Sequence, residues 1–124
     1  IEGGKMKLFK ANELKADSRP DGRIIRQIGT VNLNQKTDNL HFLEAYHPSN
    51  FTEGQHGHEK SYEIFYFFDQ AKYEINEKTY EINKGDIVVL EPGDKHGALE
   101  KNNETNILVI RIPWIEDDKI NFTE

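Results

Sequence analysis

The sequence predicts an all-β domain, and three observations support this expectation. No segment between Ile24 and Pro113 keeps the 3.6-residue apolar period of an amphipathic helix. Short runs rich in β-branched and aromatic residues recur instead, the densest being 62–68. Turn signals such as Pro92-Gly93-Asp94 separate these runs. Many short strands at close spacing are typical of an antiparallel sandwich or barrel.

The strand-like segments can be placed one after another along the chain. They are, in order, 24–31, 40–46, 62–68, 73–75, 79–82, 87–90 and 107–112. The best-defined pair is the hairpin at 73–82, where Tyr73 and Ile75 share one face and Lys72 and Glu74 the other. The segment before Ile24 is polar and mixed, so we expect it to form one short strand plus a loop.

The length of 124 residues is typical of a single domain, and a hydrophobic content of 35% is sufficient to form one core. We expect Met6 to be the natural start of the protein and the residues before it, within 1–6, to be left over from its expression. The N-terminal arm is then 7–23, the β-barrel 24–113 and the C-terminal tail 114–124. The tail is acidic, and we expect it to pack through Trp114 and then fray.

The composition excludes several function classes. No apolar run approaches 18 residues, so we expect no membrane span and no membrane partner. The net charge is -6, with no cluster of basic residues, so we expect no nucleic-acid partner. The absence of cysteine excludes disulfides, thiolate nucleophiles and cysteine zinc sites. The N-terminus lacks the apolar core of a signal peptide, and we expect a cytoplasmic protein.

Three histidines and one glutamate form a candidate metal site. His56 and His58 are two residues apart, which places both imidazoles on the same face of a strand. Glu63 follows at the start of the aromatic segment, and His96 follows a turn at the mouth of a later strand. Each residue alone is more often a solvated side chain. Together, three imidazoles and one carboxylate form a complete ligand set for a first-row transition metal, with water in the open positions.

This joint pattern resembles the two motifs of the cupin superfamily. The first contains His-x-His followed after three or four residues by Glu, and the second contains Gly, then Pro-x-Gly, two residues and His. The positions that match are His56, His58, Glu63, Gly85, Gly93 and His96. The resemblance covers about 40–112. It implies a jelly-roll β-barrel, or double-stranded β-helix, that holds a metal inside one end.

Four positions depart from the motifs. Asn50 and Gln70 replace glycines, Glu91 replaces a proline, and Glu100 replaces an asparagine. Asn tolerates a positive φ better than most residues, so the turn at Asn50 can persist. None of the four is a metal-ligand position, so the departures bear on loop geometry alone.

The resemblance implies a divalent transition metal, which is Fe, Mn, Zn, Ni, Co or Cu, held by the four motif residues. The residues themselves do not select one. We expect a metalloenzyme acting on a small oxygen-bearing metabolite. It would either oxidise the substrate with O₂ at iron, or isomerise or cleave a sugar or keto acid, with Glu63 or a tyrosine moving the proton. The alternative is a non-catalytic barrel that binds or senses a small ligand, so whether the protein is an enzyme stays open.

Strand parity suggests the walls of the pocket. If Glu63 points inward, Phe65 and Phe67 do so too and form an aromatic wall. Arg111 interrupts the last apolar strand; facing inward it would hold a carboxylate or phosphate, and facing outward, which we favour, it is a surface charge. We expect His47 to be solvated. Tyr46, Tyr73 and Tyr80 are candidate pocket hydroxyls, although core packing is the commoner role.

The opposite face of the aromatic strand carries Tyr62, Ile64, Tyr66 and Phe68. This face is too apolar to stay in contact with water. A further strand layer, the N-terminal arm or a second subunit must cover it, and we expect a homodimer.

Overall fold

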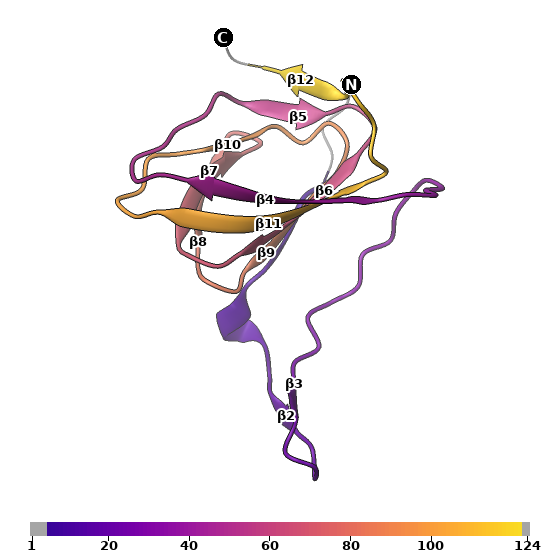
Figure 1. The fold of residues 1–124 in the computed structure, drawn as a ribbon, viewed down its shortest axis with the longest axis vertical. Helices are drawn as coiled ribbons and strands as arrows, with labels where there is room; N and C mark the ends of the chain where they lie inside the picture. Colours follow the sequence, from indigo (N-terminus) through magenta and orange to yellow (C-terminus); the bar gives the residue numbers. More distant parts are fainter. Residues whose placement is uncertain (1–4, 123–124) are drawn as a thin grey trace.

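A computed structural model describes residues 5–122 and shows a β-barrel with a projecting N-terminal arm (Figure 1). The strands are β1 (Lys7–Phe9), β2 (Asp17–Ser18), β3 (Ile24–Ile25), β4 (His41–His47), β5 (His56–His58), β6 (Tyr62–Phe67), β7 (Ala71–Ile75), β8 (Lys78–Ile82), β9 (Ile87–Leu90), β10 (His96–Ala98), β11 (Thr105–Ile112) and β12 (Lys119–Asn121). The helical structure within 5–122 is a single 3₁₀ turn, η1 (Ala11–Glu13). None of the described helices is long and apolar enough to cross a membrane.

Two five-stranded antiparallel sheets form the barrel. The first has the order β1-β9-β6-β11-β4, and the second has the order β12-β5-β10-β7-β8. Strands next to one another in each sheet are mostly distant in sequence, as in a double-stranded β-helix. The predicted all-β barrel is therefore confirmed.

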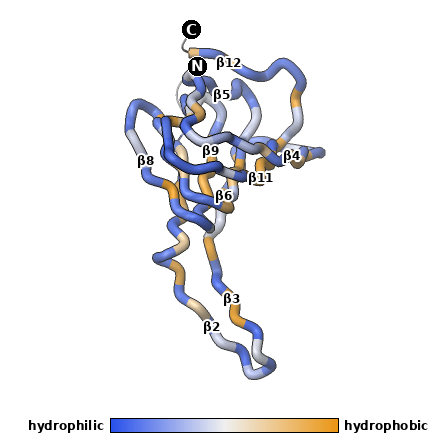
Figure 2. The backbone as a smooth tube through the Cα atoms, turned by 60° about the vertical axis from the view of Figure 1, so that its left-hand side comes forward, coloured by the Kyte–Doolittle hydropathy of each residue, from blue (hydrophilic) through white to orange (hydrophobic). Residues whose placement is uncertain are grey.

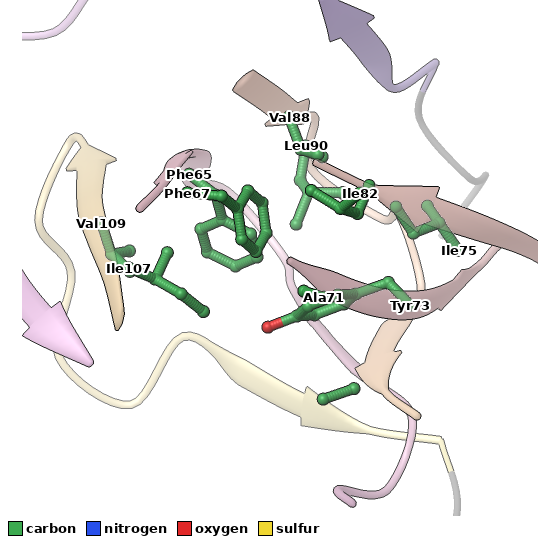
Figure 3. Packing of buried hydrophobic residues seen from close by; sticks show 11 residues of the cluster. Phe65, Phe67, Ala71, Tyr73, Ile75, Ile82, Val88, Leu90, Ile107 and Val109 are labelled. Atoms are coloured by element: carbon green, nitrogen blue, oxygen red, sulfur yellow. The ribbon is translucent and has the colours of Figure 1, made fainter. Parts of the chain in front are cut away.

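Alternating side chains fill the space between the sheets. In β6, Phe65 and Phe67 point inward as parity predicts, and they meet Tyr73 of the opposite sheet with ring centroids 6.0 Å and 5.6 Å away (Figure 3). From β11, Ile107 and Val109 close the core. Because these side chains are all removed from water, their burial stabilises the folded barrel through the hydrophobic effect.

Two of the turns have the backbone conformation that their residues suggest. Asn50 adopts a φ of 65°, so the asparagine does take the left-handed conformation expected of the motif glycine. Asn76 and Glu77 both have positive φ and form a two-residue hairpin between β7 and β8. The expected hairpin is confirmed, with a connection one residue shorter than its predicted 76–78.

Both flanking segments add an edge strand to the two sheets of the barrel. In the arm, β1 pairs with β9, and β2 pairs with β3 in a separate hairpin that projects from the body (Figures 1 and 2). The expected strand at 24–31 is only the two-residue β3. In the tail, β12 pairs with β5 rather than fraying. The expectations for residues 1–4 and 123–124 lie outside the described residues.

Asp86 fastens the arm to the barrel. Its carboxylate is fully buried and accepts hydrogen bonds from the N–H groups of Ala11 (2.8 Å) and Asn83 (2.7 Å). The ammonium group of Lys10 donates a third hydrogen bond to the same carboxylate and pairs with its charge. A buried charge that satisfies two backbone donors and one cation holds the end of β1 against the turn before β9.

We predict that Asp86→Ala destabilises the protein by about 2–4 kcal/mol. The substitution leaves two backbone N–H groups and one ammonium group without their acceptor in a mostly buried site. Chemical denaturation measures the change. Asp21→Asn removes a carboxylate from an exposed pair with Arg23 on the arm and serves as the control. A denaturation midpoint for Asp86→Ala equal to that of the control contradicts the assigned role.

Candidate functional site

The four motif residues come from three strands that belong to both sheets. His56 and His58 lie on β5, and His96 lies on the neighbouring β10, directly opposite His56 in register. Their rings are a tilted pair with centroids 4.2 Å apart. Glu63 comes from β6 in the facing sheet. The barrel therefore brings together residues that are up to 40 positions apart in sequence.

The carboxylate of Glu63 is the electrostatic centre of this cluster. It is 2% exposed, and its two oxygens lie 3.5 Å from His58 Nε2 and 3.3 Å from His96 Nε2. Burial alone would raise the pKa of Glu63. The imidazoles of His58 and His96 beside the carboxylate outweigh burial and hold that pKa well below its usual range. Glu63 is therefore a permanent negative charge inside the barrel.

The imidazole of His56 is set up as an acceptor. Its Nδ1 lies 2.9 Å from the carbonyl oxygen of Gly54, so Nδ1 carries the hydrogen and Nε2 keeps a free lone pair. Burial, followed by the charge of His96, lowers the pKa of His56 below its usual value. A neutral imidazole whose orientation is fixed by a carbonyl is the state in which histidine binds a metal.

Unpartnered polar atoms mark the same place. Nε2 of His58, Oε1 of Glu63 and Nδ1 of His96 are buried without a hydrogen-bond partner. Each such atom normally costs about 1–3 kcal/mol, so a group of three needs an explanation. Across residues 5–122, no three His, Asp or Glu side chains already surround a point where a metal ion would be held. The donor set and its unsatisfied atoms fit a cation in chemistry, although the side chains are not closed around one.

Arg111 faces the pocket, contrary to the outward orientation favoured from sequence. It lies opposite Glu63 in the register of β11 and β6, and its Nε donates to Glu63 Oε2 at 2.8 Å. The guanidinium also lies 5.5 Å from the centre of the Trp114 ring. The physical reason for this orientation is the buried charge of Glu63, which needs a counter-charge.

A cavity of about 100 Å³ adjoins this cluster. Its apolar wall is Leu43, Ala45, Phe65, Ile107 and Val109. Its polar lining is His47, Glu53, His56, Glu63, Tyr73, His96 and Arg111. Phe65 therefore lines the cavity as expected. Phe67 does not line it, because it lies deeper and is fully enclosed by the core.

Two further residues considered from the sequence, His47 and Tyr73, line this cavity. His47 lines it and packs on Phe51 with ring centroids 4.3 Å apart, so the expectation of a solvated side chain is wrong. Tyr73 lines it too, whereas Tyr46 is exposed and bonded to Glu104. Burial, helped by the charges of Glu53 and Glu63, raises the pKa of Tyr73 well above its usual value, so its phenol stays protonated.

Glu53 also lines the cavity, and the sequence gives no sign of this. It lies in the loop between β4 and β5, where no periodic pattern assigns a face to a side chain. Its backbone N–H donates to the carbonyl of Ala98, and its Oε1 accepts from the N–H of Ala98 at 3.2 Å. These two bonds turn the carboxylate toward the cavity.

Comparison with protein families gives one match. The model of the AraC-like ligand binding domain family matches residues 39–111. That range contains β4 to β10 and nearly all of β11, and with them every residue of the cluster. Comparison with curated proteins gives no significant match.

Several solved structures share the fold. A sugar 3,4-ketoisomerase from Thermoanaerobacterium thermosaccharolyticum, in complex with TDP, is 17% identical with a TM-score of 0.62, over 94% of this chain and 88% of that one. The DMSP lyase DddQ from Ruegeria pomeroyi is 19% identical with a TM-score of 0.62, over 69% of this chain but only 44% of that one. A double-stranded beta-helix protein from Klebsiella pneumoniae is 16% identical with a TM-score of 0.62, over 73% and 75%. At these identities the likeness is one of fold.

Proposed function

Because this chain belongs to the AraC-like ligand-binding domain family, within the cupin superfamily, we propose that its pocket binds a small oxygen-bearing metabolite beside a divalent transition metal. The ligands would be His56, His58, Glu63 and His96. The observation that carries this proposal is the group of buried, unpartnered imidazole and carboxylate atoms beside the cavity. The likeness of the fold to a lyase and a ketoisomerase is compatible with a metalloenzyme.

A bound metal would act as a Lewis acid on a substrate oxygen, and its identity within the Fe, Mn, Zn, Ni, Co and Cu series stays open. The chain's own residues would do the rest. Arg111 neutralises the spare charge of Glu63 and keeps that carboxylate in one orientation. The protonated phenol of Tyr73 supplies a hydrogen-bond donor to a bound oxygen. The wall of Leu43 and Val109 excludes water from the chemistry.

The second candidate is a non-catalytic barrel that binds or senses a small molecule. The family match favours it, since that family is described as a ligand-binding domain. Oxygen consumption with an iron-loaded protein, or anaerobic turnover with zinc or manganese, would instead favour catalysis. Ligand binding without turnover under either condition would favour the sensor.

We predict that protein purified without chelator contains about one transition-metal ion per chain and that the double variant His56→Ala/His58→Ala contains none, because it loses two of four ligands. Elemental analysis by mass spectrometry measures this. His41→Ala is the control, since His41 stacks on Trp114 outside the cluster. Full metal occupancy in the double variant would show that the metal is bound at another site.

We also propose a homodimer through the outer face of the first sheet. Phe42, Ile110 and Ile64 form an apolar row across β4, β11 and β6. Phe42 is 63% exposed, and Tyr46 and Phe68 beside this row are 54% and 46% exposed. The segment after the arm does reach this side of the barrel, where the Asn34 N–H bonds the Tyr62 hydroxyl at 3.0 Å, but it leaves these aromatic rings in water. A second copy would cover them.

Light scattering at tens of micromolar should therefore give the mass of a dimer, and Phe42→Asp should give a monomer with little change in melting temperature. A charge in the middle of an apolar contact opposes association without disturbing the barrel interior. Phe122→Asp is the matched control, because Phe122 is an exposed aromatic that follows β12 of the other sheet. A wild-type monomer would contradict the dimer.

A further inference from the structure

The cavity has two unlike polar ends joined by an apolar stretch. Arg111 pairs with His41 at one end of the β4–β11 ladder, and His47 pairs with Thr105 at the other. Between them the cavity is lined by inward side chains such as Val109 and Ile107. This stretch is one wall of the cavity, which polar side chains such as His56 and His96 also line. A ligand in this space therefore packs its middle against the apolar wall and meets a different polar group at each end.

At the Arg111 end, the two terminal nitrogens of the positively charged guanidinium are available to a ligand. Its Nε is engaged by Glu63, and among the described residues neither terminal nitrogen of the guanidinium has an acceptor. The side chain is 26% exposed and lines the cavity. Two parallel N–H donors with a delocalised positive charge are the preferred partner of a carboxylate.

At the His47 end, Glu53 lines the cavity close enough to His47 for their charges to interact, and it offers a free carboxylate oxygen. One oxygen accepts the N–H of Ala98, and within the described part of the chain no cation pairs with Glu53. Glu63 is different, because its two oxygens already face the imidazoles of His58 and His96 and the guanidinium of Arg111. Glu53 accepts hydrogen bonds from a ligand and repels a second negative charge.

Deepening the function proposed above, we propose that the pocket selects a short-chain hydroxy acid, with its carboxylate on Arg111 and its hydroxyl, remote from the carboxylate, donating to Glu53. The cavity volume of about 100 Å³ supports a short chain, since pockets that hold drug-sized ligands have volumes of about 300–1,000 Å³. The apolar stretch between the two ends accommodates the methylene groups.

The test is calorimetric titration of the full-length protein with four probes of equal chain length: butyrate, 3-hydroxybutyrate, 4-hydroxybutyrate and succinate. We expect at least one hydroxy acid to bind about tenfold more tightly than butyrate, the gain from one hydrogen bond to a charged acceptor. Succinate should not bind, because its second carboxylate meets Glu53. Arg111→Gln should weaken all monocarboxylates by tenfold or more.

Glu53→Gln separates this proposal from mere structural damage. The amide oxygen still accepts the N–H of Ala98, while the amide nitrogen now presents a donor to the cavity. The variant should lose the preference for the hydroxy acid and gain binding of succinate. Glu44→Gln, on the exposed face of β4, is the control and should change neither. Unchanged selectivity in Glu53→Gln, or equal affinity of wild type for butyrate and both hydroxy acids, overturns the proposal.

Metal content measured on the same samples separates the two proposals. Stoichiometric metal without binding of any probe would overturn the hydroxy-acid assignment and leave the metal site standing. Selective binding of a hydroxy acid by protein that holds no metal, even after metal is added, would support the hydroxy-acid assignment and overturn the metal site.

Discussion

A carboxylate buried at the centre of a β-barrel requires partners, and the arrangement of this site follows from that requirement. Glu63 is 2% exposed and remains charged. An unpaired charge there would cost several kcal/mol or more, so the surrounding strands must supply compensation. Arg111 from the next strand provides the counter-charge, and His58 and His96 from the facing sheet place their imidazoles beside the two carboxylate oxygens. Removing any of these groups leaves the others with an unbalanced charge or an unpartnered atom.

Part of this site can be predicted from the sequence. The spacing of His56, His58, Glu63 and His96 indicates a shared location, and the structure does bring Glu63 within 3.5 Å of both His58 and His96. Parity along the aromatic strand correctly orients Phe65. The orientation of Phe65 depends on periodicity within one strand, which is a local property of the chain, whereas the shared location of the four residues is inferred from their resemblance to the cupin motifs.

The remaining features depend on register between distant strands. The orientation of Arg111 is determined by its pairing with Glu63, 48 residues earlier, and β11 alone contains no signal of it. Glu53 is oriented by two bonds to Ala98 from outside any strand. The three-residue strand β12 forms because a barrel edge offers it unpaired backbone groups, and the acidic tail shows no pattern that predicts it. The short strand expected in the arm does form, as β1, at an edge of the other sheet.

The central claim is that neutral imidazoles of this barrel hold a metal, and a pair of thermal melts tests it most directly. A proton on a ligating nitrogen competes with the metal, and unperturbed histidines take up that proton near pH 6.5. Since metal stabilises the folded barrel over the open chain, it should raise the melting temperature at pH 7.5, and that increment should shrink steeply toward pH 5. Melts with and without added metal at several pH values between 5 and 8 measure the increment. An increment that is the same at pH 5 and pH 7.5 would contradict histidine ligation and point to a carboxylate site or to no site at all.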